Sequence, residues 1–382
     1  MDVNTPTRKI EPMIDEHNDL TPSEGENNAN PENRNIESIS EATNLDTSPI
    51  QPDVTIDYMS ARYQVSAEMN YFMEKVRSIK NECKKMVVGQ EENIELILTC
   101  ILAGGHVLLE GVPGIAKTLT AKVLSKSIEA DFARIQFTPD LLPSDIIGTS
   151  VYKMNTSEFK FEKGPVFSNV VLIDEINRAP AKTQSALFEV MEEKQISYDG
   201  IRYEMSFPFV VIATMNPIEQ EGTYKLPEAQ LDRFLMKLKL GYPNLNEEIN
   251  ILQKFKDDVH KPDLNVVKAM VTPAELAKMQ AVVSKVHVED QLYKYICELV
   301  QETRNHGKVY LGASPRSSLA ILKTAKVNAA MLGRSFVIPD DIQYVAPHII
   351  NHRLILTPDA EMEAITPESI IKEIIAELEV PR

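Results

Sequence analysis

The sequence has no tryptophan, only three cysteines, and no apolar run approaching the ~18–20 residues that cross a bilayer. Its cysteines, Cys83, Cys100 and Cys297, are scattered and odd in number, so they suggest neither a disulfide framework nor a zinc cluster. The first residues are polar and acidic, unlike a signal peptide. We therefore expect a soluble protein of the reducing cytoplasm.

Positive charge is also scarce. The formal net charge of −16 disfavours a non-specific binder of nucleic acid or of an anionic membrane, because either would need a basic face. Residues 1–55 hold twelve acidic and three basic residues and no aromatic residue. Such a segment cannot bury enough apolar area to offset the entropy lost on ordering, so we expect a disordered acidic tail.

The most informative stretch is HVLLEGVPGIAKTLT, residues 106–120. A short apolar run, a glycine-bearing turn and Lys117-Thr118 have the layout of a P-loop, G-x-x-x-x-G-K-[ST], except that Ala116 replaces the second glycine. In such a loop, backbone N–H groups and the helix N-terminus bind phosphate oxygens, the lysine reaches the outer phosphates, and the hydroxyl can ligate magnesium. The alternative is an ordinary strand–turn–helix with a chance match. The expected nucleotide contacts of the loop are Gly111, Val112, Pro113, Gly114, Ile115, Ala116, Lys117, Thr118 and Leu119.

A second half-site is expected where another apolar run, residues 170–173, ends in Asp174 and Glu175. An acid at the end of a parallel strand can hold magnesium, directly or through water, and an adjacent glutamate can polarise the attacking water. Thr118 and Asp174 are therefore the predicted metal ligands, and Glu175 is the predicted catalytic carboxylate. Acids also close strands as caps, but two half-sites in the right order favour an ATPase.

The rest of the chain predicts two domains after the tail. Residues 66–243 predict an α/β domain with a parallel-sheet core and two inserted β-hairpins, at 148–164 and 196–203, the second with an Asp199-Gly200 turn. From Tyr242 helical periodicity dominates, so residues 244–382 predict an all-helical lid domain.

These motifs together resemble the AAA+ ATPases and, more narrowly, their MoxR branch. The resemblance rests on GVPGIAKT, LIDEINRAPAKTQSALFEVMEE, ATMNPIEQEGTYKLPEAQLDRF and SPRSS, in this order, and covers roughly residues 66–380. Alanine before the P-loop lysine is usual in MoxR proteins.

The resemblance implies roles for further residues. Asn216 matches the sensor-one residue that helps to place water beside Glu175. Arg233, in LDRF, matches the arginine finger that reaches the nucleotide of the neighbouring subunit. Arg316, in SPRSS, matches the sensor-two arginine, which contacts the γ-phosphate bound by its own chain. Val88 and Gly89 lie where AAA+ proteins contact adenine.

The implied function is ATP- and Mg²⁺-dependent, chaperone-like remodelling or maturation of other proteins by a homo-oligomer, a hexameric ring by analogy. The usual partners of the family carry von Willebrand factor A domains. A nucleic-acid motor and a metal-chelatase type of motor remain alternatives, because related proteins do such work. The exposed tips expected at Met154, Phe159, Phe161 and Tyr198 suit a protein partner better than DNA. A binding module without hydrolysis is disfavoured, since every expected catalytic position is filled.

Overall fold

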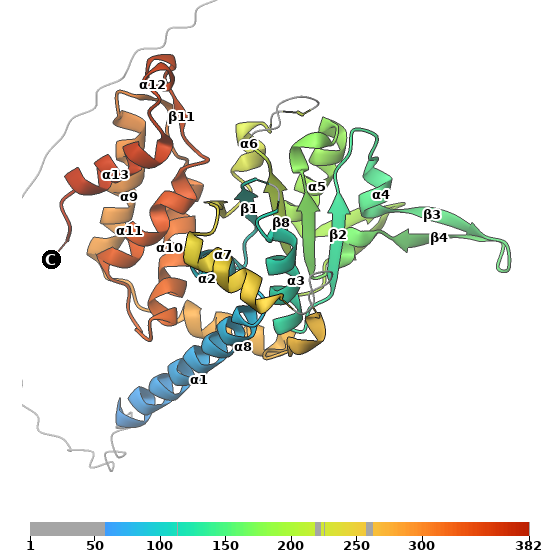
Figure 1. Cartoon of the computed structure of the whole chain (residues 1–382), viewed down its shortest axis with the longest axis horizontal. Coiled ribbons are helices and arrows are strands. Elements are labelled where there is room, and N and C mark those ends of the chain that lie inside the picture. Colours follow the sequence, from blue (N-terminus) through green and yellow to red (C-terminus); the bar gives the residue numbers. More distant parts are fainter. Residues whose placement is uncertain (1–57, 113, 218–222, 225, 257–262, 382) are drawn as a thin grey trace, which may run out of the picture. The chain divides into compact units, whose positions relative to one another are not determined.

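Five parallel strands form the central sheet, in the order β2–β5–β8–β1–β9 (Figure 1). The structure, a computed structural model, describes residues 58–112, 114–217, 223–224, 226–256 and 263–381, with side chains from residue 67 onward. The predicted tail and Pro113 lie outside the described residues. The strands are β1 (Val107–Glu110), β2 (Phe132–Gln136), β5 (Val170–Asp174), β8 (Val210–Met215) and β9 (Met236–Lys239).

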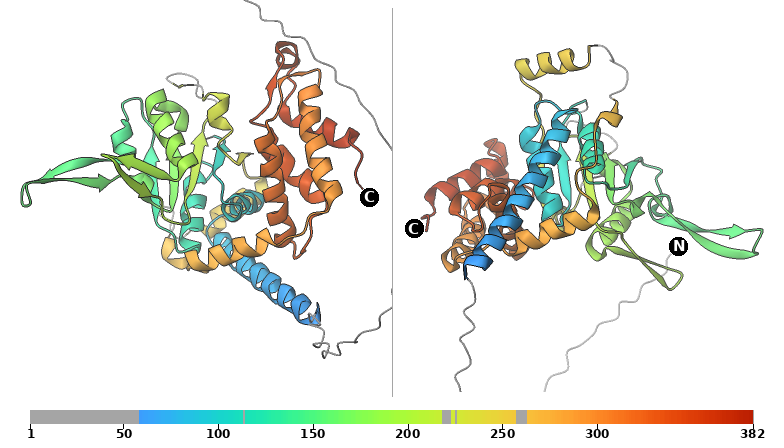
Figure 2. Two further views of the ribbon diagram at one scale, coloured as in Figure 1. Left: turned by 180° about the vertical axis from the view of Figure 1, so that it is seen from behind. Right: turned by 90° about the horizontal axis from the view of Figure 1, so that it is seen from below.

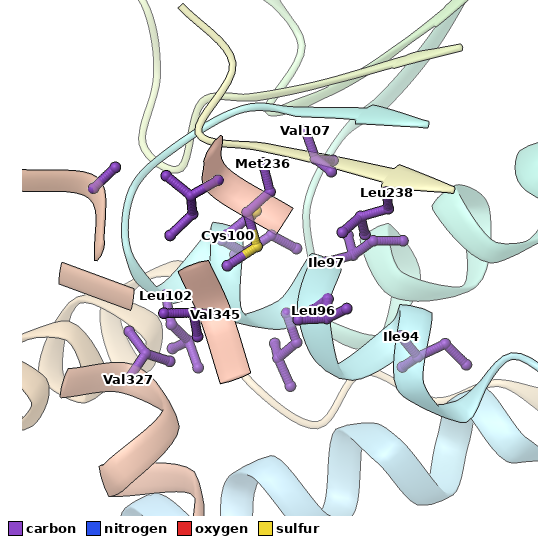
Figure 3. Close-up of a cluster of buried hydrophobic side chains, with 14 of the residues drawn as sticks. Ile94, Leu96, Ile97, Cys100, Leu102, Val107, Met236, Leu238, Val327 and Val345 are labelled. Atoms are coloured by element: carbon purple, nitrogen blue, oxygen red, sulfur yellow. The ribbon is translucent and has the colours of Figure 1, made fainter. Parts of the chain in front are cut away.

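Helices cover both faces of this sheet, as a buried parallel sheet requires. In β5, Val170 and Leu172 join a hydrophobic cluster with the first three helices, whereas Val171 and Ile173 join a second cluster with α5. Figure 3 shows the first cluster around α2, whose Cys100 belongs to the same core as the β-strands. The helices of this part are α1 (Tyr58–Lys84), α2 (Glu91–Leu102), α3 (Lys117–Ser127), α4 (Pro143–Ile147), α5 (Ala181–Glu193) and α6 (Glu228–Leu231). Burial on both faces thus explains why β5 and β8 are continuous apolar runs.

Both predicted hairpins are confirmed. They are β3 (Gly148–Lys153) with β4 (Glu158–Lys163), and β6 (Gln195–Tyr198) with β7 (Ile201–Glu204). The second hairpin turns at Asp199 and Gly200, whose φ angles of 50° and 77° are the left-handed values that a two-residue hairpin turn favours. Figures 1 and 2 show β3 and β4 extending away from the sheet.

The predicted helical domain is also confirmed, with one addition. In α9 the buried side chains include Leu292, Ile296 and Leu299, which follow the predicted spacing. A short antiparallel pair, β10 (Val309–Leu311) with β11 (Ile355–Leu356), was not predicted, because runs of two or three residues leave no periodic pattern. The helices are α7 (Leu245–Lys254), α8 (Pro273–Ser284), α9 (Asp290–Asn305), α10 (Pro315–Met331), α11 (Pro339–Ile350), α12 (Pro358–Met362) and α13 (Pro367–Glu377).

One hydrophobic cluster continues from the sheet into α8, α9, α10 and α11, so the predicted boundary at residues 243 and 244 is not marked by a break in the core. The boundaries of the domains therefore stay predictions. Within the described ranges, no helix has both the length and the apolar character that a membrane crossing demands.

A buried arginine fastens the segment after α6 to the helical domain. Arg353, whose side chain is only 4% exposed, donates from Nε to Oδ1 of Asp232 over 2.6 Å. Its Nη2 donates to the carbonyl of Phe234 over 2.7 Å. The residue between these two acceptors is Arg233, so Arg353 fixes the backbone on which Arg233 stands.

Replacing Arg353 with alanine should lower the free energy of unfolding by about 3–5 kcal/mol, because a partly buried carboxylate and buried carbonyls lose their donor. The free energy of unfolding of Arg353→Lys should lie between those of the wild type and of Arg353→Ala, since lysine keeps the charge but lacks the planar fork. Urea denaturation measures both effects, with Arg77→Ala on the exposed surface of α1 as the control. Equal unfolding free energies for Arg353→Ala and Arg77→Ala would contradict the assigned anchor.

Candidate functional site

The loop after β1 forms with the geometry that its residue types require. A Cβ at Gly111 would lie 2.5 Å from Cδ1 of Ile115 and 3.0 Å from the carbonyl oxygen of Leu240, so a side chain there would force its neighbours to shift. Ala116 is left-handed, with φ 60° and ψ 19°, directly before α3 begins at Lys117. This conformation explains why the general motif has glycine at that position, and it costs alanine on the order of 1 kcal/mol.

A cavity of about 380 Å³ lies against this loop, at the carboxyl ends of β2, β5 and β8. It brings together eight of the predicted site residues, which come from three separate motifs. Three polar residues that the sequence analysis did not single out, Arg134, Gln136 and Thr214, also line it. The described lining residues are Gly114, Ala116, Lys117, Thr118, Leu119, Arg134, Gln136, Asp174, Glu175, Thr214 and Asn216.

Of the other predicted nucleotide contacts, Val88, Gly89, Gly111, Val112 and Ile115 are described, and they do not line this cavity. Ile115 is buried in the hydrophobic core, so it can offer a ligand only its backbone. Gly89 packs against α7, since a Cβ there would come within 2.7 Å of Cδ of Glu247 in that helix. A larger cavity of about 720 Å³ lies between α9 and residues 378–381, but Glu298, Glu302 and Glu379 line it, and three carboxylates oppose phosphate binding.

Asp174 is a buried carboxylate with two partners from neighbouring strands. Its Oδ2 accepts from Nε of Arg134 over 2.6 Å, and its Oδ1 accepts from the hydroxyl of Thr214 over 3.3 Å. The same Thr214 hydroxyl accepts from the backbone N–H of Glu175 over 3.0 Å. Three strands therefore fix the position of this acid.

Glu175 lies at the mouth of the cavity with its own pair of donors. Its Oε2 accepts from Nε2 of Gln136 over 2.8 Å and lies 3.0 Å from Nε of Arg178. Its backbone is left-handed, with φ 58° and ψ 52°, which is strained for a residue with a side chain. This turn directs Glu175 away from the course of β5, while Asp174 ends the strand.

Lys117 and Thr118 face these acids from the first turn of α3. Nζ of Lys117 donates to the carbonyl of Gly111 over 2.6 Å, which holds the ammonium across the loop. Oxygen donors of the kind that Mg²⁺ prefers are present in the Thr118 hydroxyl and the Asp174 carboxylate. In the described residues, His, Cys, Asp and Glu nowhere gather in a group of three or more that could hold a metal. The oxygen donors of Thr118 and Asp174 fit Mg²⁺, which characteristically binds one or two protein oxygens together with water and substrate phosphates.

Arg233 and Arg316 lie in another cavity, of about 300 Å³. One carboxylate holds both: Oε2 of Glu192 accepts from Nη1 of Arg233 over 3.1 Å, and its Oε1 accepts from Nη2 of Arg316 over 2.6 Å. Arg316 does not line the cavity of Lys117, so the structure does not place it at the phosphate site of its own chain, as the resemblance implied. It lies with Arg233 because α10 begins beside the end of α5, where Glu192 stands.

A buried histidine connects the end of α5 with the strand that leads to Asn216. Burial lowers the pKa of His106 to about 4, so the ring is neutral. Its Nδ1 accepts from the backbone N–H of Val211 in β8 over 2.9 Å. Its Nε2–H then donates to the carbonyl of Met191, next to Glu192, over 3.2 Å. The neutral ring of His106 thus joins β8, which borders the first cavity, to the end of α5, which borders the second.

The inserted hairpins present fewer exposed apolar tips than the sequence predicted. Met154 and Phe159 are 86% and 74% exposed, as expected. Phe161 and Tyr198 are half-buried instead, because their ring centroids lie 4.7 Å apart across the two hairpins. These two rings hold the hairpins together, which leaves Met154 and Phe159 as the exposed tip.

Comparison with known proteins agrees with this geometry. The model of the "ATPase family associated with various cellular activities (AAA)" matches residues 106–236, and that of the "AAA lid domain" matches residues 301–374. The protein YeaC of Bacillus subtilis is 48% identical over 297 residues, which is 78% of this chain and 92% of YeaC.

The "Chaperone MoxR1" of Mycobacterium tuberculosis is 44% identical over 310 residues, which is 79% of this chain and 81% of that protein. The crystal structure of a proposed ATPase from Cytophaga hutchinsonii superposes with a TM-score of 0.78 at 41% identity, and the match covers 85% of this chain and 99% of that one. The parallel-sheet core, the helical lid and these relatives lead to one conclusion. This chain belongs to the MoxR family of AAA+ ATPases.

Proposed function

We propose that this chain hydrolyses Mg²⁺-ATP in a ring of identical subunits and uses the cycle to remodel or mature partner proteins. The observation that carries the proposal is the single cavity that gathers Lys117, Thr118, Asp174, Glu175 and Asn216. It contains a cation for the outer phosphates, two oxygen donors for a metal, and a carboxylate beside a buried amide. These are the groups that phosphoryl transfer to water requires.

Each group has a part in the proposed reaction. The N-terminus of α3 and Lys117 bind the phosphates, while Thr118 and Asp174 orient the metal. Magnesium, when bound, neutralises charge on the transferred phosphoryl group. The attacking water donates a hydrogen bond to the carboxylate of Glu175, which polarises the water, and Asn216 fixes the position of that water. Gln136 and Arg178 hold Glu175 through Oε2, and Oε1 is the oxygen that we assign to the water.

The position of the two arginines supports catalysis between subunits. Arg233 and Arg316 have side chains 30% and 52% exposed, and both lie outside the phosphate cavity of their own chain. In a head-to-tail ring, such a surface can face the phosphate cavity of the next subunit. We therefore assign both arginines to the neighbouring nucleotide, in a hexamer by analogy with related ATPases.

The partner is proposed to be a protein, of the von Willebrand factor A class that the family resemblance implies. The exposed tip formed by Met154 and Phe159 supports a protein contact. The strands beside that tip mix Lys153 and Lys160 with Glu158 and Glu162, so they lack the uniform basic charge of a nucleic-acid groove. Free, unpaired cysteines throughout the described residues agree with the proposed cytoplasmic location.

Lys117→Ala should abolish nucleotide binding, because the phosphate cavity loses the ammonium that reaches the outer phosphates. Binding of a fluorescent ATP analogue, followed by anisotropy, measures this. Lys122→Ala, in the same helix but outside the lining of the cavity, is the matched control and should bind normally. An unchanged affinity in Lys117→Ala would refute the proposed phosphate site.

Glu175→Gln should bind ATP with near-normal affinity but lose at least about 10²-fold in turnover, because an amide cannot act as a base toward water. Steady-state phosphate release and analogue binding, measured on the same preparation, separate the two effects. Glu193→Gln, an exposed glutamate outside the cavity, is the control. Normal turnover in Glu175→Gln would assign the catalytic carboxylate to another residue.

Arg233→Ala should bind ATP but hydrolyse it slowly; arginine fingers elsewhere contribute about 10³–10⁵ in rate. Mixing it with Lys117→Ala should restore activity, because some interfaces then pair an intact phosphate cavity with an intact arginine. A mixture of Lys117→Ala with the double variant Lys117→Ala/Arg233→Ala contains no intact cavity and serves as the control. If mixed rings form without any recovery, catalysis between subunits is excluded.

A further inference from the structure

Arg134 is a cation inside the phosphate cavity that no motif of the sequence announces. It lies on β2, two residues before Gln136, so both side chains emerge on the same face of the strand. Gln136 donates a hydrogen bond to Glu175 and Arg134 donates one to Asp174, and both donors also line the cavity. One strand therefore contacts both acids of the proposed reaction, and Arg134 contacts the one assigned to the metal.

The bond between Arg134 and Asp174 uses the same negative charge that a metal would use. Asp174 is 7% exposed, and its Oδ2 accepts from Nε of Arg134 over 2.6 Å, the length of a strong charge-assisted hydrogen bond. A divalent cation beside Asp174 would repel the guanidinium and compete for the carboxylate. Arg134 and Mg²⁺ are therefore alternative counter-ions for one acid.

The side chain of Arg134 also has space to move away from Asp174. Its side chain is 50% exposed, and it opens on the cavity that Lys117 and Thr118 share. A guanidinium has five N–H donors, so one released from Asp174 can bind a phosphate oxygen in the same cavity. A displaced Arg134 finds this second partner only when a nucleotide is present.

Resting on the proposed function, we propose that Arg134 is a positioning residue that couples metal entry to nucleotide binding. With Asp174 neutralised by Arg134, the acid neither repels the incoming phosphates nor holds a metal by itself. When the nucleotide brings Mg²⁺, Asp174 would hold the metal in place of Arg134, and the released guanidinium of Arg134 would donate to a phosphate oxygen. Asp174 therefore has a positive counter-ion both before and after the nucleotide binds.

The proposal predicts two opposite changes in Arg134→Gln. Without its counter-ion, Asp174 should attract metal more strongly, so the Mg²⁺ concentration for half-maximal binding of the fluorescent ATP analogue should fall about tenfold, the scale of one hydrogen bond to a charged group. In EDTA the bare carboxylate should repel the phosphates, so the metal-free affinity should fall several-fold. Arg134→Lys keeps the charge and should stay near the wild type in both measurements.

A merely structural arginine would give a different result. It would leave the Mg²⁺ requirement unchanged in Arg134→Gln, or shift it equally in Arg134→Gln and Arg134→Lys, and either outcome overturns the proposal. Arg77→Gln on the surface of α1 is the control for loss of a positive charge. If Arg134→Gln does not unfold cooperatively, Arg134→Met, which keeps the apolar stem without the charge, takes its place with the same expectations.

Lys117→Ala is titrated in parallel, so that failure of this inference is distinguished from failure of the proposed function. Loss of binding in Lys117→Ala together with an unchanged Mg²⁺ requirement in Arg134→Gln overturns only the role of Arg134. Retained, Mg²⁺-dependent binding in Lys117→Ala overturns the phosphate site itself.

Discussion

The parallel pairing of β5 with β2 on one side and β8 on the other is the constraint on which the proposed phosphate cavity depends. Parallel strands bring their carboxyl ends to one edge of a sheet, and ligands of α/β proteins bind beyond that edge. The register aligns Gln136 with Asp174. A slip of one residue in β2 would turn both Arg134 and Gln136 to the opposite face of the sheet and leave both acids without these donors.

Backbone strain is stored on both sides of that cavity. Ala116 and Glu175 both adopt left-handed conformations, each at a cost on the order of 1 kcal/mol. Buried neighbours, Ile115 beside the first and Ile176 beside the second, anchor the two turns in the hydrophobic clusters. Packing of the core thus holds the loop and the carboxylate in positions that the isolated chain would avoid.

The positively charged side chains of the proposed site lie in two separate cavities. The phosphate cavity contains Lys117 and Arg134, while Arg233 and Arg316 share Glu192 in another cavity. Arg353 fixes the backbone around Arg233 to the helical domain. Movement of that domain would therefore move Arg233 with it, which is the kind of linkage a proposed ring ATPase needs between its nucleotide state and its shape.

The sequence by itself determined the fold class, the order of the elements and the residues of the two phosphate-site motifs, because these are local: a glycine-bearing turn, an apolar run ending in acids, a hairpin turn with Asp-Gly. It also identified the arginines of LDRF and SPRSS through resemblance. Tertiary structure alone decided that Arg134, Gln136 and Thr214 join the acids, since strand register sets these contacts across some 40 residues of chain. It likewise decided that Arg316 lies with Arg233, because helix packing, which leaves no local signal, sets where α10 begins relative to α5.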